Sequence, residues 1–404
     1  MLKQFLRNYR IWWQPPRIAG NRLEHRQVSF VELFYDLVYV AIIAELSHAL
    51  VTHISWVELG RFAFLFTLVW WAWLNGAAYH DIHGNNDIRT RVFTFLQMLT
   101  VVSMAIFAHD AMGTSAVGFA LSYAAFQLIL TYMWWRTGVY DPDHAVLSNP
   151  YSVAFLTTTL LFAGSVFVPA PIRFYLWAAA LVISLLLPII YMNLGRFNEK
   201  AQEQLDISTP VSPSFVERFG LFSIIVLGEV IVAVVAGVTS HHKLTLEIAL
   251  LALLGTLTAM VLWWLYFDFV SHRMPIEKNV FAGTTWIYLH LPTTLGITLV
   301  GASVLAILEN NAELLSSTLR WLYTGGAAIT LGSIALLTFT IQLPSGDQQA
   351  NRKGRISMFA SATLIALLGF SSFEPIPLFL AVVALMITPV FFALLVWVAG
   401  QVTD

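Results

Sequence analysis

The feature that most constrains this chain is a series of long apolar segments. A helix needs about 20 apolar residues to cross the hydrocarbon core of a bilayer, and we mark twelve such segments in the 404 residues. They lie near 30–51, 58–79, 92–109, 115–135, 151–169, 173–194, 215–238, 245–268, 281–308, 318–342, 356–372 and 376–399. Backbone groups in lipid must bond within their own segment. We therefore expect an all-α fold, a polytopic membrane helix bundle with twelve transmembrane helices.

Composition agrees with a membrane protein. The chain is 58% hydrophobic and 11% charged, with a mean hydropathy of +0.73, whereas soluble domains carry about 25% charged residues. The net charge of −2 gives no reason to expect nucleic acid as a partner. The sequence has no cysteine, which excludes disulfides and thiolate ligands. Nothing in the sequence predicts a cofactor or a metal centre, so none is assigned.

The lysines and arginines orient the predicted helices. With the N-terminus in the cytoplasm, sixteen of the 21 fall on the inner side and four on the outer side, with Arg218 at a helix start. Such a bias follows the positive-inside rule. It predicts a multi-pass protein of the bacterial inner membrane with both termini in the cytoplasm. Residues 1–27 form a basic cytoplasmic segment that lacks a signal-peptide pattern and is expected to be retained.

The sequence also suggests a duplication. Ser-Phe-Val-Glu occurs at 29–32 and again at 214–217, and tryptophan pairs occupy 70–71 and 263–264. These matches predict a first six-helix repeat at 28–194, a cytoplasmic linker at 195–213 and a second six-helix repeat at 214–404. Six helices per half give the halves the same orientation, a parallel repeat. Chance similarity between tryptophan-rich helices is the alternative.

One charge cluster is predicted at the cytoplasmic ends of the first and seventh segments. Glu32 and Asp36 are four residues apart and share a helix face, and Glu217 and Arg218 enter the seventh segment at a similar level. We expect Arg218 to pair with Asp36 or Glu32. The cluster is either a gate that collects cations or a structural clamp between two helices.

Two further acids are predicted deeper in the membrane. Glu45 lies about 20 Å beyond Glu32, and Glu229 lies about 18 Å beyond Glu217, at 1.5 Å per residue. Their matched positions suggest a proton or cation site between the repeats, tuned by His48 one turn from Glu45. His290, two residues before Pro292, is a candidate for the same transport site. Each acid could equally be a core residue with a local hydrogen bond, and for a single buried histidine such as His290 a hydrogen-bonded core residue is the more common outcome.

Other polar positions are weaker candidates. Asn75, Gln97 and Asp268 are predicted polar partners, because a shift of 193 residues places Asn75 on Asp268 and Gln97 on His290. The turn His80–Asp87 contains His-x-x-His and two aspartates, but without a second ligand group we favour a solvated loop over a metal site.

Several motifs resemble one known family. The runs ELFYDLVYV at 32–40 and ERFGLF at 217–222, with LGE at 227–229, are similar to the paired acidic motifs of the bacterial low temperature requirement A (LtrA) family. The segments WLN at 73–75, LQM at 96–98 and HLP at 290–292 also resemble it. The chain departs from the family at 80–87, where HDIHGNND replaces an aspartate-rich turn. The resemblance implies a polytopic inner-membrane protein, and the family name refers to growth in the cold without giving an activity.

Two classes of function follow from these patterns. The leading hypothesis is a secondary transporter that moves an unidentified small solute across the lipid bilayer. A more specific version of this hypothesis couples the transport to protons. The alternative is a lipid-handling protein or membrane enzyme with a polar site inside the bundle, whose candidate groups are Asp36, His290 and the turn at 80–87. The sequence shows none of the common hydrolase or phosphate-binding motifs, so an enzyme is the less favoured class. A homo-oligomer is left open.

Overall fold

The computed structural model describes residues 14–18, 26–195, 198–208, 211–271, 273–276, 280–310, 315–343 and 348–403. Most of the predicted basic segment 1–27 lies outside these ranges. The described residues form helices and a single isolated bridge between Pro275 and Ile341. The predicted all-α class is therefore confirmed for the described part of the chain.

Twelve long helices overlap the twelve predicted segments. They are α2 (Phe30–Thr52), α3 (Trp56–His83), α4 (Ile88–Ala108), α5 (Ala116–Tyr140), α6 (Ala145–Ser165), α7 (Ile172–Gly195), α9 (Pro213–Thr239), α10 (Leu246–Phe269), α11 (Val280–Glu309), α12 (Ser317–Leu337), α13 (Gln348–Leu368) and α14 (Pro375–Thr403). Among the described residues, nine of these helices are long and apolar enough to span a membrane. The other three long helices are α2, α12 and α13. Nine candidate spans indicate a multi-pass membrane protein, and the number of twelve transmembrane helices stays a prediction.

The predicted linker 195–213 contains a short helix that the sequence reading did not expect. This helix, α8 (Glu199–Ser208), buries Ala201 and Leu205. The two side chains are four residues apart and therefore lie on one face. The helix packs against α6 and α7, so the polar linker is anchored by two apolar side chains.

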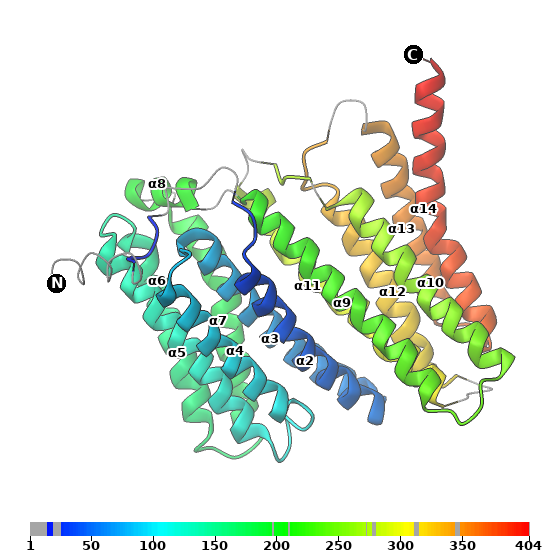
Figure 1. Ribbon diagram of the computed structural model, residues 1–404, viewed down its shortest axis with the longest axis horizontal. Helices are drawn as coiled ribbons and strands as arrows, with labels where there is room; N and C mark the ends of the chain where they lie inside the picture. Colours follow the sequence, from blue (N-terminus) through cyan, green and yellow to red (C-terminus); the bar gives the residue numbers. More distant parts are fainter. Residues whose placement is uncertain are drawn as a thin grey trace, which may run out of the picture. The chain divides into compact units, whose positions relative to one another are not determined.

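The helices divide into two compact units. The first consists of the chain up to Glu45 with Thr67–Arg218, and the second of Leu46–Phe66 with the chain from Phe219 onward. In the first unit, α4, α5, α6 and α7 each pack against the next in sequence, as the cyan to green helices in Figure 1 show. In the second unit, α11, α12, α13 and α14 do the same, and α10 packs against α14.

The two tryptophan pairs that suggested a duplication differ in their surroundings. Trp70 and Trp71 on α3 are 1% and 2% exposed, whereas Trp263 and Trp264 on α10 are 48% and 44% exposed. The first pair is core packing, and the second presents a wide apolar surface. The Trp match alone therefore does not indicate two equivalent environments.

Close helix packing in the second unit depends on two glycines. A Cβ added to Gly296 on α11 would lie 2.7 Å from the carbonyl oxygen of Gly326 and 3.0 Å from the backbone nitrogen of Thr330, both on α12. A Cβ at Gly326 would lie 3.0 Å from the carbonyl oxygen of Gly296. Small residues let helix backbones approach in this way in membrane proteins.

We predict that Gly296→Ala destabilises the protein, because the new methyl group meets backbone atoms that cannot rotate away. Overpacking of this kind costs about 1–3 kcal/mol. The measurement is the thermal unfolding temperature of the purified protein in detergent.

The control is Gly332→Ala on α12, where an added Cβ meets no described atom within 4 Å. Alanine is the better helix former by about 1 kcal/mol, so this variant should unfold at the same or a slightly higher temperature. Equal unfolding temperatures for the two variants would contradict the packing argument.

Candidate functional site

The centre of the candidate site is a buried ion pair in the first unit. Arg218, on the second turn of α9, donates from Nη2 to Asp36 Oδ1 at 2.5 Å and from Nε to Asp36 Oδ2 at 3.2 Å. Both side chains are fully buried. The fork of the guanidinium matches the two carboxylate oxygens, which is the strongest geometry for such a pair. The predicted pairing of Arg218 with an acid of α2 is therefore present.

Groups of α2 and α3 complete the surroundings of this pair. Trp73 Nε1 donates to Asp36 Oδ1 at 2.8 Å, and Arg218 Nη1 donates to the carbonyl oxygen of Ala77 at 3.3 Å. The ring of Tyr35 lies 5.6 Å from the guanidinium carbon of Arg218, within range of a cation–π contact. Three helices, α2, α3 and the start of α9, thus meet at one arginine.

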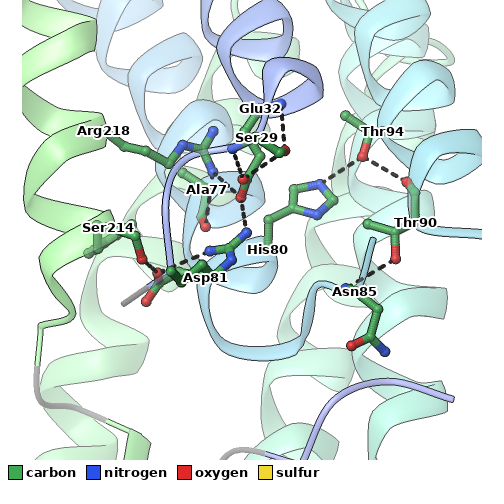
Figure 2. A network of polar contacts seen from close by, with 12 residues as sticks. Ser29, Glu32, Ala77, His80, Asp81, Asn85, Thr90, Thr94, Ser214 and Arg218 are labelled. Carbon is green, nitrogen blue, oxygen red and sulfur yellow. Dashed lines mark hydrogen bonds and ion pairs between the residues drawn. The ribbon is translucent and has the colours of Figure 1, made fainter. Parts of the chain in front are cut away.

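Glu32 forms the second part of the cluster and is 4% exposed. Its Oε2 accepts from the backbone nitrogen and the hydroxyl of Ser29, each at 2.9 Å, which closes the start of α2 as a capping box does. Its Oε1 pairs with Arg26 and lies 3.7 Å from Arg218 Nη1. Figure 2 shows Glu32 and Arg218 on the same side of His80.

Asp81, near the end of α3, is the third carboxylate, and the sequence reading missed its role. Its Oδ1 accepts from the hydroxyls of Ser212 and Ser214, at 2.6 Å and 2.8 Å, and lies 3.4 Å from Arg26 Nη1. Both serines stand at the start of α9. We define the Arg218 cluster as Arg26, Glu32, Asp36, Asp81 and Arg218, of which Figure 2 labels Glu32, Asp81 and Arg218.

The two histidines of the predicted turn have separate partners. His80 Nε2 lies 3.2 Å from Gln97 Oε1 and 3.3 Å from Thr94 Oγ1. His83 Nδ1 donates to the carbonyl oxygen of Arg17 at 2.9 Å, and its ring stands edge-on to His144 at 4.9 Å. Burial lowers the pKa of His144, which precedes α6. Within the described residues, no group of three His, Asp or Glu could hold a metal ion.

His290, in the second unit, is a buried and hydrogen-bonded core residue. Its Nδ1 donates to the carbonyl oxygen of Trp286 at 2.7 Å, which leaves Nε2 to accept from the hydroxyl of Tyr266 at 2.9 Å. The rings of Trp286 and Phe219 lie 4.3 Å and 4.5 Å away. These contacts are those expected if His290 is a hydrogen-bonded core residue, the alternative to the predicted transport site.

The predicted symmetric acids do not occupy similar environments. Glu45 and His48 on α2 are exposed. Glu229 on α9 is 7% exposed and makes no hydrogen bond or ion pair to a described residue of its own unit. The expected equivalence of Glu45 and Glu229 therefore fails at the level of burial.

The remaining predicted residues lie apart from the cluster centre. Glu217 is exposed, although it precedes Arg218 directly. Asn75 is half-buried and donates to the carbonyl oxygen of Trp71 at 2.8 Å, within its own helix. Asp268 is exposed and accepts from Trp264 Nε1.

We predict that Asp36→Asn strongly destabilises the protein, because it leaves the guanidinium of Arg218 buried without its counter-charge. Breaking one partner of a buried pair costs about 3–5 kcal/mol. The double variant Asp36→Asn with Arg218→Gln removes both charges and should recover part of the loss. The measurement is the thermal unfolding temperature in detergent of the wild type, the single variant and the double variant.

Glu217→Gln is the matched control, because it removes a charge from the exposed neighbour of Arg218. Surface substitutions of this kind stay within about 0.5 kcal/mol of the parent protein. If Asp36→Asn unfolds at the same temperature as Glu217→Gln, the buried pair does not stabilise this unit.

Comparison with known proteins identifies the family of this chain. The chain is 30% identical over 294 residues to an uncharacterized protein of Rhizobium meliloti strain 1021, a match that covers 69% of each chain. The model of the bacterial low temperature requirement A protein (LtrA) family matches residues 27–402. Nearly all of the chain, including both acidic motifs, lies within this match, and the protein therefore belongs to the LtrA family.

Proposed function

We propose that the protein is a secondary transporter of a small solute, coupled to protons through the Arg218 cluster. One observation carries the proposal: five ionisable side chains are gathered inside a unit built largely from membrane-spanning helices. Charged groups in such places are expensive and typically line substrate or proton pathways.

The charge balance of the cluster depends on the protonation of its carboxylates. Its side chains comprise three carboxylates, Glu32, Asp36 and Asp81, and two guanidiniums, Arg26 and Arg218. Arg17 donates to the backbone carbonyls of Asp81 and Ile82, so its positive charge lies beside the cluster and balances the third carboxylate. Adding a proton to one carboxylate therefore leaves this group of side chains with an excess positive charge.

Asp81 is the group on which that proton would act. As a carboxylate it accepts two hydroxyls, from Ser212 and Ser214, and so holds the start of α9 against α3. Adding a proton weakens these charge-assisted hydrogen bonds. The start of α9 is then free to loosen, which makes the cluster a proton-sensitive gate. A permanent clamp would show no such response.

The predicted topology forms part of the proposal. We infer an inner-membrane protein with both termini in the cytoplasm and twelve spans arranged as two parallel repeats, 28–194 and 214–404. The sequential packing of α4–α7 and of α11–α14 supports the repeat. So do two hydrogen bonds between corresponding helices, one from His80 on α3 to Gln97 on α4 and one from Tyr266 on α10 to His290 on α11.

The test uses liposomes that contain the purified protein and an internal pH dye. Amino acids, carboxylic acids, organic cations and sugars are added outside, one class at a time. We expect one class to enter together with protons in the wild type. Asp81→Asn, which keeps the shape of the side chain and the Asp36–Arg218 pair, should abolish the proton movement.

Glu217→Gln serves as the control and should behave as the wild type. An equal proton signal from Asp81→Asn would overturn the coupling mechanism. If no class of solute moves while the protein remains folded, the transporter is rejected in favour of the alternative, a lipid-handling protein.

A further inference from the structure

The second unit contains a cavity that the Arg218 cluster does not involve. It has a volume of about 540 Å³ and lies between the end of α10, the start of α13 and the last described side chains of α14. In Figure 1 these are the labelled helices α10, α13 and α14, coloured from green to red. Small-molecule sites typically measure about 300–1,000 Å³, so the cavity is large enough for a ligand group.

Part of the cavity lining is polar and carries both signs of charge. Its polar residues are Asp268 and Ser271 at the end of α10, Arg273 just beyond them, and Asn351 on α13. Asp268 Oδ2 accepts from Trp264 Nε1, and this hydrogen bond does not involve Oδ1. A guanidinium and a carboxylate in one cavity match a ligand that itself carries an anion and a cation.

Asn351 is the lining residue whose hydrogen-bonding groups lack partners. Its side chain is 3% exposed, yet neither Nδ2 nor Oδ1 has a hydrogen-bond partner among the described residues. A buried amide group without a hydrogen-bond partner destabilises the protein by about 1–3 kcal/mol. A ligand with both an acceptor and a donor would satisfy it.

The cavity also has apolar lining residues. Val390 and Leu394 of α14 line it together with Phe267 and Phe269 of α10. Both helices are candidate membrane spans, and the cavity is at the last turns of their described spans. Charged side chains at the helix ends, together with apolar side chains of the spans, match the boundary between lipid headgroups and acyl chains.

We propose that this cavity binds one phospholipid with a zwitterionic, primary-amine headgroup, of the phosphatidylethanolamine type. The phosphate faces Arg273 and Asn351 Nδ2, the ammonium faces Asp268 and Asn351 Oδ1, and the acyl chains follow α14. A quaternary ammonium cannot donate the hydrogen bonds that Asp268 and Asn351 accept. The site therefore prefers phosphatidylethanolamine to phosphatidylcholine. This inference does not depend on the proposed transport function.

The test is native mass spectrometry of the delipidated full chain titrated with phosphatidylethanolamine, phosphatidylcholine or phosphatidylglycerol in detergent. We expect one tightly held phosphatidylethanolamine per chain. Asp268→Asn should remove the preference over phosphatidylcholine, and its exposed position makes a folding defect unexpected. Glu374→Gln, an exposed carboxylate elsewhere in the same unit, is the charge-matched control and should keep the preference.

Asn351→Leu gives a second and opposite readout. Replacing an unmet amide by an apolar side chain should raise the unfolding temperature of the lipid-free protein while weakening phosphatidylethanolamine binding about tenfold, as expected for the loss of one or two hydrogen bonds. If Asn351 had only a structural role, Asn351→Leu would lower the unfolding temperature and leave lipid binding unchanged.

Three results would overturn the proposal. They are equal binding of phosphatidylethanolamine and phosphatidylcholine, stronger binding of phosphatidylglycerol, and binding of soluble phosphoethanolamine as tight as that of the lipid. The last result would show a site for a free metabolite instead of a membrane lipid.

Discussion

The burial of Arg218 is the constraint on which the rest of the first unit depends. A guanidinium without solvent contact is tolerated only where counter-charges and acceptors surround it. Asp36 supplies two oxygens, Ala77 a carbonyl and Tyr35 an aromatic face. These partners come from α2 and α3, so satisfying one side chain fixes the start of α9 against two other helices. Asp81 and its serines reinforce the same junction.

Sequence reasoning found the helices and the central pair because both leave local signals. Long apolar runs mark the helices, and acids at two helix starts beside one arginine indicate a pair. Asp81, Ser212 and Ser214 left no such signal, because residues more than 130 positions apart meet only in the folded chain. His290 was a candidate because of its depth and the nearby Pro292, and its hydrogen bonds to Tyr266 and Trp286 could not be predicted from the sequence.

The contrast between Glu45 and Glu229 has a simple geometric origin. Glu45 lies 13 residues after Glu32, and Glu229 lies 12 after Glu217. One residue rotates a side chain by about 100° around a helix of 3.6 residues per turn. Similar depth therefore does not imply the same helix face, and one acid is exposed while the other is buried. The polar groups that the structure gathers lie instead in the Arg218 cluster and at the cavity beside Asn351.

The most direct test of the proposed gate uses the absence of native cysteine. Ser214→Cys places a single thiol at a buried position beside Asp81, with little change in size. The rate at which a water-soluble thiol reagent modifies it in liposomes reports opening at the start of α9. A proton-sensitive gate predicts measurable modification whose rate changes with pH after correction for thiolate content. A thiol that stays unmodified at every pH, and becomes reactive only on denaturation, would establish a permanent clamp and contradict the account.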